Sequence, residues 1–173
     1  MAVEKLDLES RPPLTVDEFE ALAEQQGWGE DTPVELLDGE LIWMSPINDP
    51  HIGCVNRLNR LFHRRFPEGL VLVSVQNPVR TGSYDEPEPD IALLKPRADD
   101  YGTAKATPPD ILLLVEVADK TLRTDLGRKA RIYASAGCQS TGSSISTHTR
   151  CTCTARRPAA RISRGRYWRL AWK

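Results

Sequence analysis

Two short apolar stretches near the middle of the chain decide its fold class: Glu88-Pro89-Asp90-Ile91-Ala92-Leu93-Leu94 and Ile111-Leu112-Leu113-Leu114-Val115-Glu116-Val117. Each is short enough to be a buried strand, and each carries an acidic residue, Asp90 or Glu116, in or beside its apolar run. Burying an unpaired carboxylate costs several kcal/mol, so this pair requires an explanation. Two carboxylates that project side by side from neighbouring strands form a site for a hard divalent cation.

A lysine follows these two acids on the next expected helix. It is Lys129, in the stretch that begins with Asp125. A metal held by Asp90 and Glu116 can polarise a phosphate and lower the pKa of a bound water, and a lysine can stabilise charge that develops on the phosphate. Acid, acid and lysine in this order therefore predict metal-dependent cleavage of a phosphodiester bond.

Composition restricts the class of protein further. The 173 residues, of which 40% are hydrophobic and 27% charged, suit one soluble globular domain with a real core. No apolar run approaches the roughly 20 residues that span a bilayer, and the first residues lack the pattern of a signal peptide. We therefore expect a cytoplasmic protein without a membrane partner. The net charge of −1 provides no global field that would steer the protein onto nucleic acid.

The order of the expected elements indicates an α/β (α+β) fold. A capping box at Thr15 and Glu18 predicts a helix that ends near Gly27, and an Asp-Gly pair at 38–39 predicts a hairpin. We expect a helix from Asp49, which can cap it, and then a mixed central sheet flanked by helices. The remaining elements are a helix to residue 65, strands at 69–76, 88–94 and 110–117, and a helix at 125–136.

The strand that should follow the last helix is not recognisable in the sequence. From Gly137 onward the chain has no acidic residue and is rich in Ser, Thr and Arg. Suitable codons for residues 138–146, read one base earlier, give Pro-Glu-Tyr-Trp-Leu-Val-Asp-Leu, a convincing strand. We therefore expect a nuclease-like domain at residues 1–137, an aberrant tail at 138–173 produced by a frameshift or disordered, and loss of the last core strand.

Several motifs, taken in order, resemble those of the Uma2 family of restriction endonucleases. They are Glu-Leu-Leu-Asp-Gly-Glu-Leu at 35–41, His51, Gln-Asn-Pro at 76–78, Glu-Pro-Glu-Pro-Asp-Ile-Ala-Leu-Leu at 86–94, Leu-Val-Glu-Val-Ala-Asp-Lys-Thr-Leu-Arg-Thr-Asp at 114–125, and the run from Lys129 to Gly137. The resemblance covers about residues 14 to 137. The family also carries Pro-Glu-Tyr-Trp-Leu-Val-Asp next, which agrees with the shifted reading frame.

This resemblance implies the restriction-endonuclease-like fold of the PD-(D/E)xK nuclease superfamily. It implies that Asp90 and Glu116 are catalytic residues that bind Mg²⁺ or Mn²⁺. The usual lysine, two residues after the second acid, is replaced by Ala118, and Lys129 takes its role. The implied reaction is hydrolysis of DNA, and cleavage of two strands suggests a homodimer.

Other residues have two interpretations. Glu40, in the hairpin, is a candidate for a further catalytic acid or an exposed turn residue. His51 can cap a helix or contact phosphate, and Gln76 ends a strand. The basic residues of the helix at 49–65 form either a solvated face or a DNA-binding patch; they are Arg57, Arg60, His63, Arg64 and Arg65. The alternative function is a non-catalytic nucleic-acid-binding descendant of the nuclease fold, or an inactive truncated product.

Overall fold

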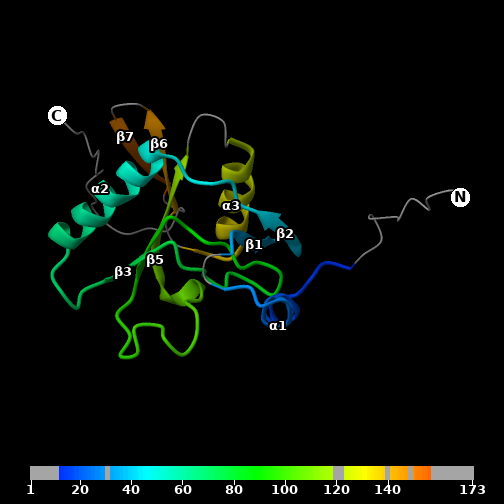
Figure 1. Cartoon of the computed structure of the whole chain (residues 1–173). Helices are drawn as coiled ribbons and strands as arrows, with labels where there is room; N and C mark the ends of the chain where they lie inside the picture. The colour runs from blue at the N-terminus through cyan, green and yellow to red at the C-terminus, as the bar shows by residue number, and fades with distance from the viewer. Residues whose placement is uncertain (1–11, 30–31, 119–122, 139–140, 148–149, 157–173) are drawn as a thin grey trace, which may run out of the picture.

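The computed structural model describes residues 12–29, 32–118, 123–138, 141–147 and 150–156. A five-stranded sheet with the order β3-β4-β5-β6-β7 forms its centre (Figure 1). The strands are β3 (Leu72–Val75), β4 (Ile91–Leu94), β5 (Ile111–Ala118), β6 (Thr141–Thr147) and β7 (Arg150–Arg156). β5 and β6 run parallel, whereas the other neighbours are antiparallel. The mixed central sheet expected from the sequence is thus confirmed.

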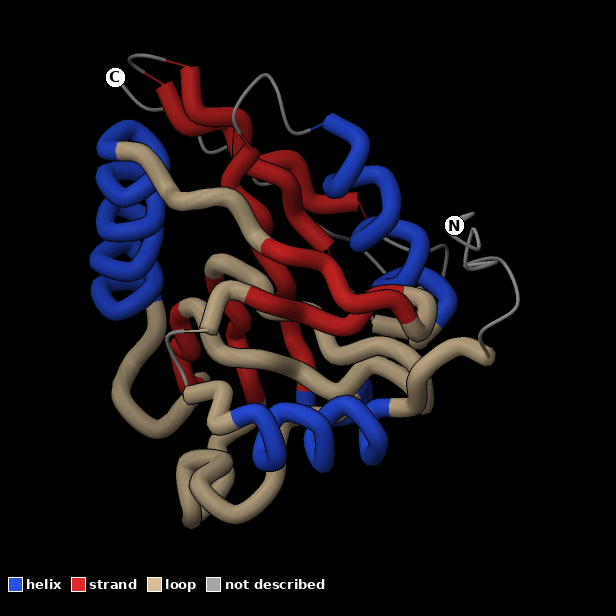
Figure 2. Tube along the Cα trace, turned by 45° about the vertical axis from the view of Figure 1, so that its right-hand side comes forward, coloured by secondary structure: helices blue, strands red, loops and turns tan. Residues whose placement is uncertain are grey.

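Two helices cover opposite faces of this sheet (Figures 1 and 2). Helix α2 (Asp49–Arg65) packs Leu58 and Phe62 against Ile91 and Val115, whereas α3 (Arg123–Ser135) shares the other core with Leu114. Successive residues of a strand point to opposite faces, so from Leu113 to Val117 the odd-numbered side chains of β5 point toward α2 and the even-numbered ones toward α3. None of the helices in the described parts of the chain is long and apolar enough to cross a membrane.

The N-terminal elements form a separate small layer. Helix α1 (Val16–Gln26) begins with the predicted capping box and ends at Gly27, whose φ of 66° is left-handed. Strands β1 (Val34–Leu37) and β2 (Glu40–Trp43) form the predicted antiparallel hairpin. Its turn needs glycine at position 39, because a Cβ there would overlap Pro13 and because φ is 74°. The short 3₁₀ helix η2 (Pro108–Asp110) leads into β5.

The start of α2 differs slightly from the sequence expectation. Asn48, rather than Asp49, is the N-cap, and its side chain accepts a hydrogen bond of 3.1 Å from the backbone N–H of His51. Capping therefore fixes the first turn of α2, from which the His51 side chain reaches the N-terminal end of β4.

The prediction that the last core strand is lost is wrong, because the backbone of this segment does form a strand. The segment after α3 forms β6, which pairs in parallel with β5 from Leu114 to Ala118, and β7 extends the sheet. Strand pairing is made by backbone N–H and C=O groups, so an extended segment can complete a ladder even when its side chains lack the usual apolar pattern. The frameshift origin of the tail stays a prediction, and residues 157–173 lie outside the described part of the chain.

Candidate active site

Asp90 lies at the entrance to β4 and is tied to both neighbouring elements. Its side chain is 12% exposed. One oxygen, Oδ1, lies 2.8 Å from Nε2 of His51 on α2, and Oδ2 accepts a hydrogen bond of 2.6 Å from the backbone N–H of Val117 on β5. These two contacts hold the carboxylate at the junction of α2, β4 and β5.

Glu116 faces the same position from β5. Ile91 pairs with Val115 in the antiparallel register, and Asp90 and Glu116 are the next residues beyond this pair, close enough for the charge of Asp90 to raise the pKa of Glu116. The even position of Glu116 directs its side chain toward α3, where Tyr133 Oη donates a hydrogen bond of 2.5 Å to its Oε1. The sheet therefore brings together the two acids that the sequence identified.

Lys129 joins this pair from α3. It lies one helical turn before Tyr133, so both side chains project from the same face of the helix. The Lys129 ammonium is 3.5 Å from Oε1 of Glu116, and it donates a hydrogen bond of 3.0 Å to the backbone carbonyl of Glu88. The lysine is 8% exposed.

Glu35 completes the cluster and was not recognised from the sequence. Its Oε2 lies 2.9 Å from the Lys129 ammonium and accepts a hydrogen bond of 3.1 Å from the backbone N–H of Glu88. Glu35 is 4% exposed in the apolar strand β1. The same signal that identified Glu116, an acid within an apolar strand, was available for Glu35.

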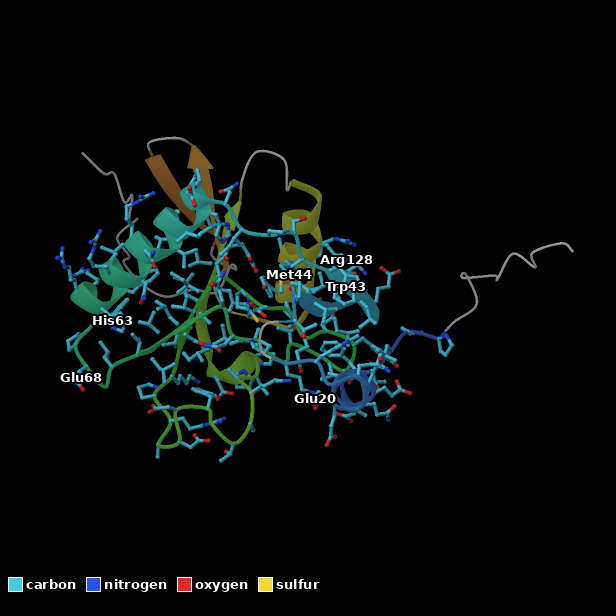
Figure 3. All side chains as sticks on the ribbon, in the orientation of Figure 1. Glu20, Trp43, Met44, His63, Glu68 and Arg128 are labelled. Carbon is cyan, nitrogen blue, oxygen red and sulfur yellow. The ribbon has the colours of Figure 1, made fainter. Side chains whose placement is uncertain are left out.

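Glu40 is not part of this cluster. Its side chain is 68% exposed and pairs at 2.8 Å with Arg128, which also contacts Asp38 at 2.7 Å. Arg128 lies beside the hairpin, on the outside of the molecule (Figure 3). The two consecutive residues Arg128 and Lys129 thus bind different acids, one pair at the surface and one in the interior.

Burial and charge shift the pKa values of the clustered groups. Burial raises the pKa of Glu116 to about 7, Asp90 and Glu35 add to the rise, and Lys129 and the Tyr133 hydrogen bond reduce it. Burial alone would lower the pKa of Lys129, but the carboxylates of Glu116 and Glu35 outweigh it and raise that pKa above its usual range. Burial, and then Glu116, raise the pKa of Tyr133 well above 10. Lys129 is therefore charged and Tyr133 neutral at neutral pH.

The cluster has an excess of negative charge. Four carboxyl groups, those of Glu35, Glu88, Asp90 and Glu116, lie around the ammonium group of Lys129. Burial, and then Glu35, also raise the pKa of Glu88, so a proton or a further cation would relieve the repulsion. Oxygen donors around an uncompensated negative charge are what a hard divalent cation requires.

The donor set suits a cation that keeps much of its water. The described residues contain no group of three or more His, Cys, Asp and Glu side chains arranged to enclose a metal. Mg²⁺ is commonly held by one or two carboxylates, with water and substrate oxygens as its other ligands. Asp90 and Glu116 fit that requirement, whereas a site closed by protein ligands alone is not present in the described part of the chain.

The remaining candidates lie around this cluster or on α2. His51 contacts Asp90, and the backbone N–H of Gln76 donates to the carbonyl of Asp90 at 3.2 Å. Gln76 has a φ of 51°, which is unusual for a residue other than glycine. The basic residues of α2 are exposed; they are Arg57, Arg60, His63, Arg64 and Arg65. Figure 3 shows His63 directed away from the sheet.

Comparison with known proteins places the chain in a family. A crystal structure of a nuclease described as "putative" and as belonging to DUF820, from Anabaena variabilis, has a similar fold, with a TM-score of 0.63 and 16% sequence identity. The similarity covers 86% of this chain and 82% of that one. No curated protein matches the chain. The model of the Uma2 family, described as "Putative restriction endonuclease", matches residues 16–142, and the chain therefore belongs to the Uma2 family.

Proposed function

We propose that this protein is a divalent-metal-dependent endonuclease that hydrolyses phosphodiester bonds in DNA. The observation that carries the proposal is the buried cluster in which Asp90 and Glu116 lie near each other beside the charged Lys129. Membership of a family described as restriction endonucleases supports a nuclease, and the cluster provides the groups that such a reaction needs.

Asp90 and Glu116 would hold the metal ion, Mg²⁺ or Mn²⁺. When bound, the ion supplies a Lewis acid for the phosphate and lowers the pKa of a coordinated water. The protein orients its two ligands through neighbours, since His51 and the Val117 N–H hold Asp90 and Tyr133 holds Glu116. Such contacts to metal ligands fix their direction and strengthen binding.

Lys129 would act on the phosphate or on the attacking water. Its ammonium lies 3.5 Å from Glu116 and is kept protonated by the surrounding carboxylates. A fixed positive charge in a partly dry site stabilises negative charge that develops on the phosphate oxygens. Glu35, at 2.9 Å from the ammonium, would be a positioning residue that keeps Lys129 in this place. The exposed Glu40 has no part in this mechanism.

The negative charge of the cluster would be offset at the scissile phosphate by Lys129 and the bound metal ion, and the DNA on either side of it would lie along a surface outside the acidic cluster. Helix α2 starts at the site with His51 and continues into exposed arginines, which can contact the DNA backbone. Cleavage of both strands of a duplex would use two copies of the chain, as a symmetric homodimer.

The test is plasmid cleavage in the presence of Mg²⁺ or Mn²⁺. We expect the wild-type chain to convert supercoiled plasmid, and we expect Asp90→Asn, Glu116→Gln and Lys129→Met to abolish the reaction. Glu24→Gln, an exposed acid on α1, is the matched control and should retain activity. A folded wild-type chain that binds Mn²⁺ and DNA but cuts none of several substrates would contradict the proposal and favour a non-catalytic descendant of the fold.

A further inference from the structure

Gln76, the residue that follows β3, has a backbone conformation that glutamine rarely adopts. Its φ is 51°, in the left-handed region where the Cβ of most residues crowds the backbone. A residue held in such a conformation is strained, and strained residues of this kind are common at active sites and ligand-binding sites. The cause of the strain at Gln76 therefore bears on the function of the proposed nuclease centre.

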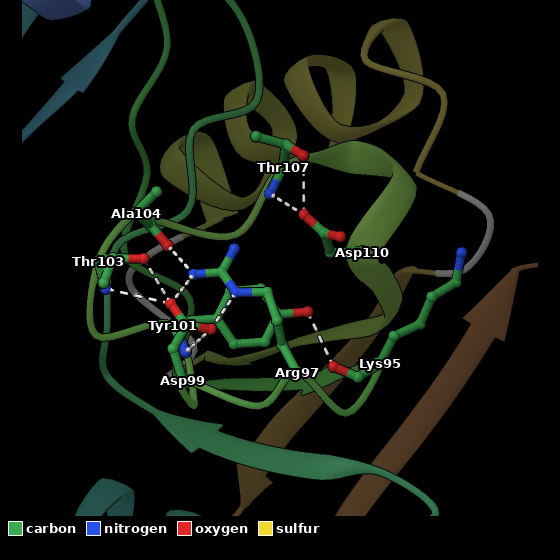
Figure 4. A network of polar contacts seen from close by, with 8 residues as sticks. All are labelled: Lys95, Arg97, Asp99, Tyr101, Thr103, Ala104, Thr107 and Asp110. Atoms are coloured by element: carbon green, nitrogen blue, oxygen red, sulfur yellow. Dashed lines mark hydrogen bonds and ion pairs between the residues drawn. The ribbon is translucent and has the colours of Figure 1, made fainter.

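The other described residues with this conformation, glycines aside, have local explanations. Asp38 and Asp100 lie in turns, and aspartate adopts the left-handed region more readily than most residues. Tyr101 is held by its own side chain. The guanidinium carbon of Arg97 lies 3.9 Å from the centre of its ring, and its Oη donates a hydrogen bond of 2.8 Å to a backbone carbonyl of the same loop (Figure 4). Residue type or side-chain contacts therefore account for these three positions.

Neither explanation applies to Gln76. Its side chain is exposed, and none of the described residues forms a hydrogen bond with its amide group. Glycine would adopt the same backbone conformation without strain, because it has no Cβ. No contact in the described part of the chain thus requires a glutamine here, and its amide group is available to a ligand.

The backbone of Gln76 is bonded to that of Asp90, one of the two proposed metal ligands. The N–H of Gln76 donates a hydrogen bond of 3.2 Å to the carbonyl of Asp90. Val75 pairs with Ile91, and Gln76 and Asp90 are the next residues beyond this pair. Neighbouring strands lie about 5 Å apart. The Gln76 amide is therefore within a side chain's length of the place where the proposed centre holds a phosphate.

A carboxamide is a suitable phosphate-binding group at this place. Its NH₂ group donates hydrogen bonds but carries no charge. A further lysine or arginine here would be attracted to the carboxyl groups that already surround Lys129. A neutral amide stays available to the substrate, and glutamine is among the residues that contact the phosphates of DNA.

We propose that Gln76 is a substrate-binding residue, whose amide donates a hydrogen bond to a phosphate oxygen of the DNA beside Asp90. Because β3 is an outer strand of the central sheet, this contact would extend the DNA-binding surface to the sheet edge. The inference rests on the proposed nuclease function, to which it adds a neutral contact on the β3 side of Asp90, whereas Lys129 acts from α3.

The test compares Gln76→Gly and Gln76→Asn with the parent chain. Glycine removes the amide and relieves the backbone, whereas asparagine keeps a carboxamide and tolerates the left-handed conformation. DNA binding is measured by the fluorescence anisotropy of a fluorescein-labelled duplex. Every chain carries Asp90→Asn, and EDTA is present, so that no cleavage occurs. We expect Gln76→Gly to bind about tenfold more weakly, and Gln76→Asn to recover part of that loss.

Urea unfolding separates this role from a purely structural one. If Gln76 only shaped the chain, glycine would be tolerated at this φ and DNA binding would not change. We expect the urea midpoint of Gln76→Gly to stay level or rise while its affinity for DNA falls. The matched control is Asp100→Gly, which places glycine at another left-handed position, in a turn outside the acidic cluster, and should not weaken binding.

Three outcomes would overturn the inference. The first is equal binding by Gln76→Gly and the parent chain, and the second is a parent chain that binds no DNA. The third is a loss of binding that accompanies a lower urea midpoint and that Gln76→Asn does not reverse. Binding that requires the Gln76 amide, in a protein whose wild-type form cleaves no DNA, would support the contact and refute the nuclease proposal alone.

Discussion

The phenol of Tyr133 donates a hydrogen bond of 2.5 Å to Oε1 of Glu116, from the interior of α3 to the interior of β5. Both side chains are largely withdrawn from water, since Tyr133 is 1% exposed and the Glu116 side chain 12%. This contact favours the ionised form of Glu116, which is the form that can bind a metal. This hydrogen bond therefore links a buried core residue, Tyr133, to a proposed metal ligand, Glu116.

We expect Tyr133→Phe to shift the acid side of the pH–rate profile upward. Removing the donor takes away a contact that lowers the pKa of Glu116, so ionisation of that group would require a higher pH. The variant should also lose about 1–3 kcal/mol of unfolding free energy, because a buried acceptor loses its partner. Tyr84→Phe, at an exposed tyrosine, is the control. An unchanged pH profile would show that the phenol does not tune Glu116.

Glu116 should make the protein less stable as the pH rises toward neutrality. Its pKa is about 7 in the folded protein and 4.5 when unperturbed, so the folded state binds the proton more tightly. The associated stability is complete below pH 4.5 and is lost as the pH rises through about 7. The full difference is about 3 kcal/mol.

Urea unfolding at pH 5 and pH 8, with and without Glu116→Gln, measures this contribution. We expect the wild type to lose more unfolding free energy than the variant between the two pH values. Mg²⁺ should reduce the loss in the wild type, because a cation stabilises the ionised carboxylates. If both proteins respond to pH equally, Glu116 does not have the raised pKa.

Lys129 and Glu35 should show strong energetic coupling. Lys129→Met leaves Glu35 and Glu116 buried without their cation, and we expect it to cost about 3–5 kcal/mol. Adding Glu35→Gln should recover part of this loss, because it removes one of the unpaired charges. A double-mutant cycle by urea unfolding measures the coupling.

The neighbouring ion pair is a natural control for this cycle. Arg128 and Glu40 form the same kind of contact at the surface, where the Glu40 side chain is 68% exposed. The same cycle with Arg128→Met and Glu40→Gln should give a coupling below about 1 kcal/mol. Coupling of equal size at the two sites would contradict a buried, functional role for the interior pair.

The arginines of α2 can be tested by the salt dependence of DNA binding. If Arg60 and Arg64 contact phosphates, replacing both with alanine should reduce the slope of log K against log salt by about 2. Arg131→Ala, an exposed arginine on α3, should leave the slope unchanged. The measurement uses Asp90→Asn in EDTA to prevent cleavage. An unchanged slope in the double variant would indicate a solvated face.

Local sequence patterns predicted the elements whose structure is determined by side chains close in the sequence. The capping box at Thr15, the Asp-Gly turn and the two acid-bearing strands could all be predicted from short stretches, because local hydrogen bonds and alternation fix them. The meeting of Asp90, Glu116 and Lys129 followed from strand and helix order together with the family resemblance. Glu35 could not be placed, since its contact with Lys129 depends on how the hairpin packs against α3.

In the tail, by contrast, the side-chain pattern did not predict a strand that the structure contains. Residues 141–147 have no strand pattern in their side chains, yet their backbone pairs with β5. A hydrophobic pattern depends on side chains, whereas an unpaired strand edge forms hydrogen bonds with backbone groups whatever side chains they carry. Side-chain patterns therefore underestimated the ability of this segment to complete the sheet, whereas the aberrant origin of the tail stays a prediction.

Restoring the reading frame after Gly137 should strengthen the sheet. The shifted codons place Tyr, Trp, Leu and Val in the segment that follows α3, and these residues favour strands. Each large apolar side chain that becomes buried contributes about 1.5–3 kcal/mol, so a gain of several kcal/mol in unfolding free energy is expected. Urea unfolding of both chains, with plasmid cleavage measured in parallel, tests this. Equal stability of the two chains, or an intact frame on resequencing of the gene, would refute the frameshift hypothesis.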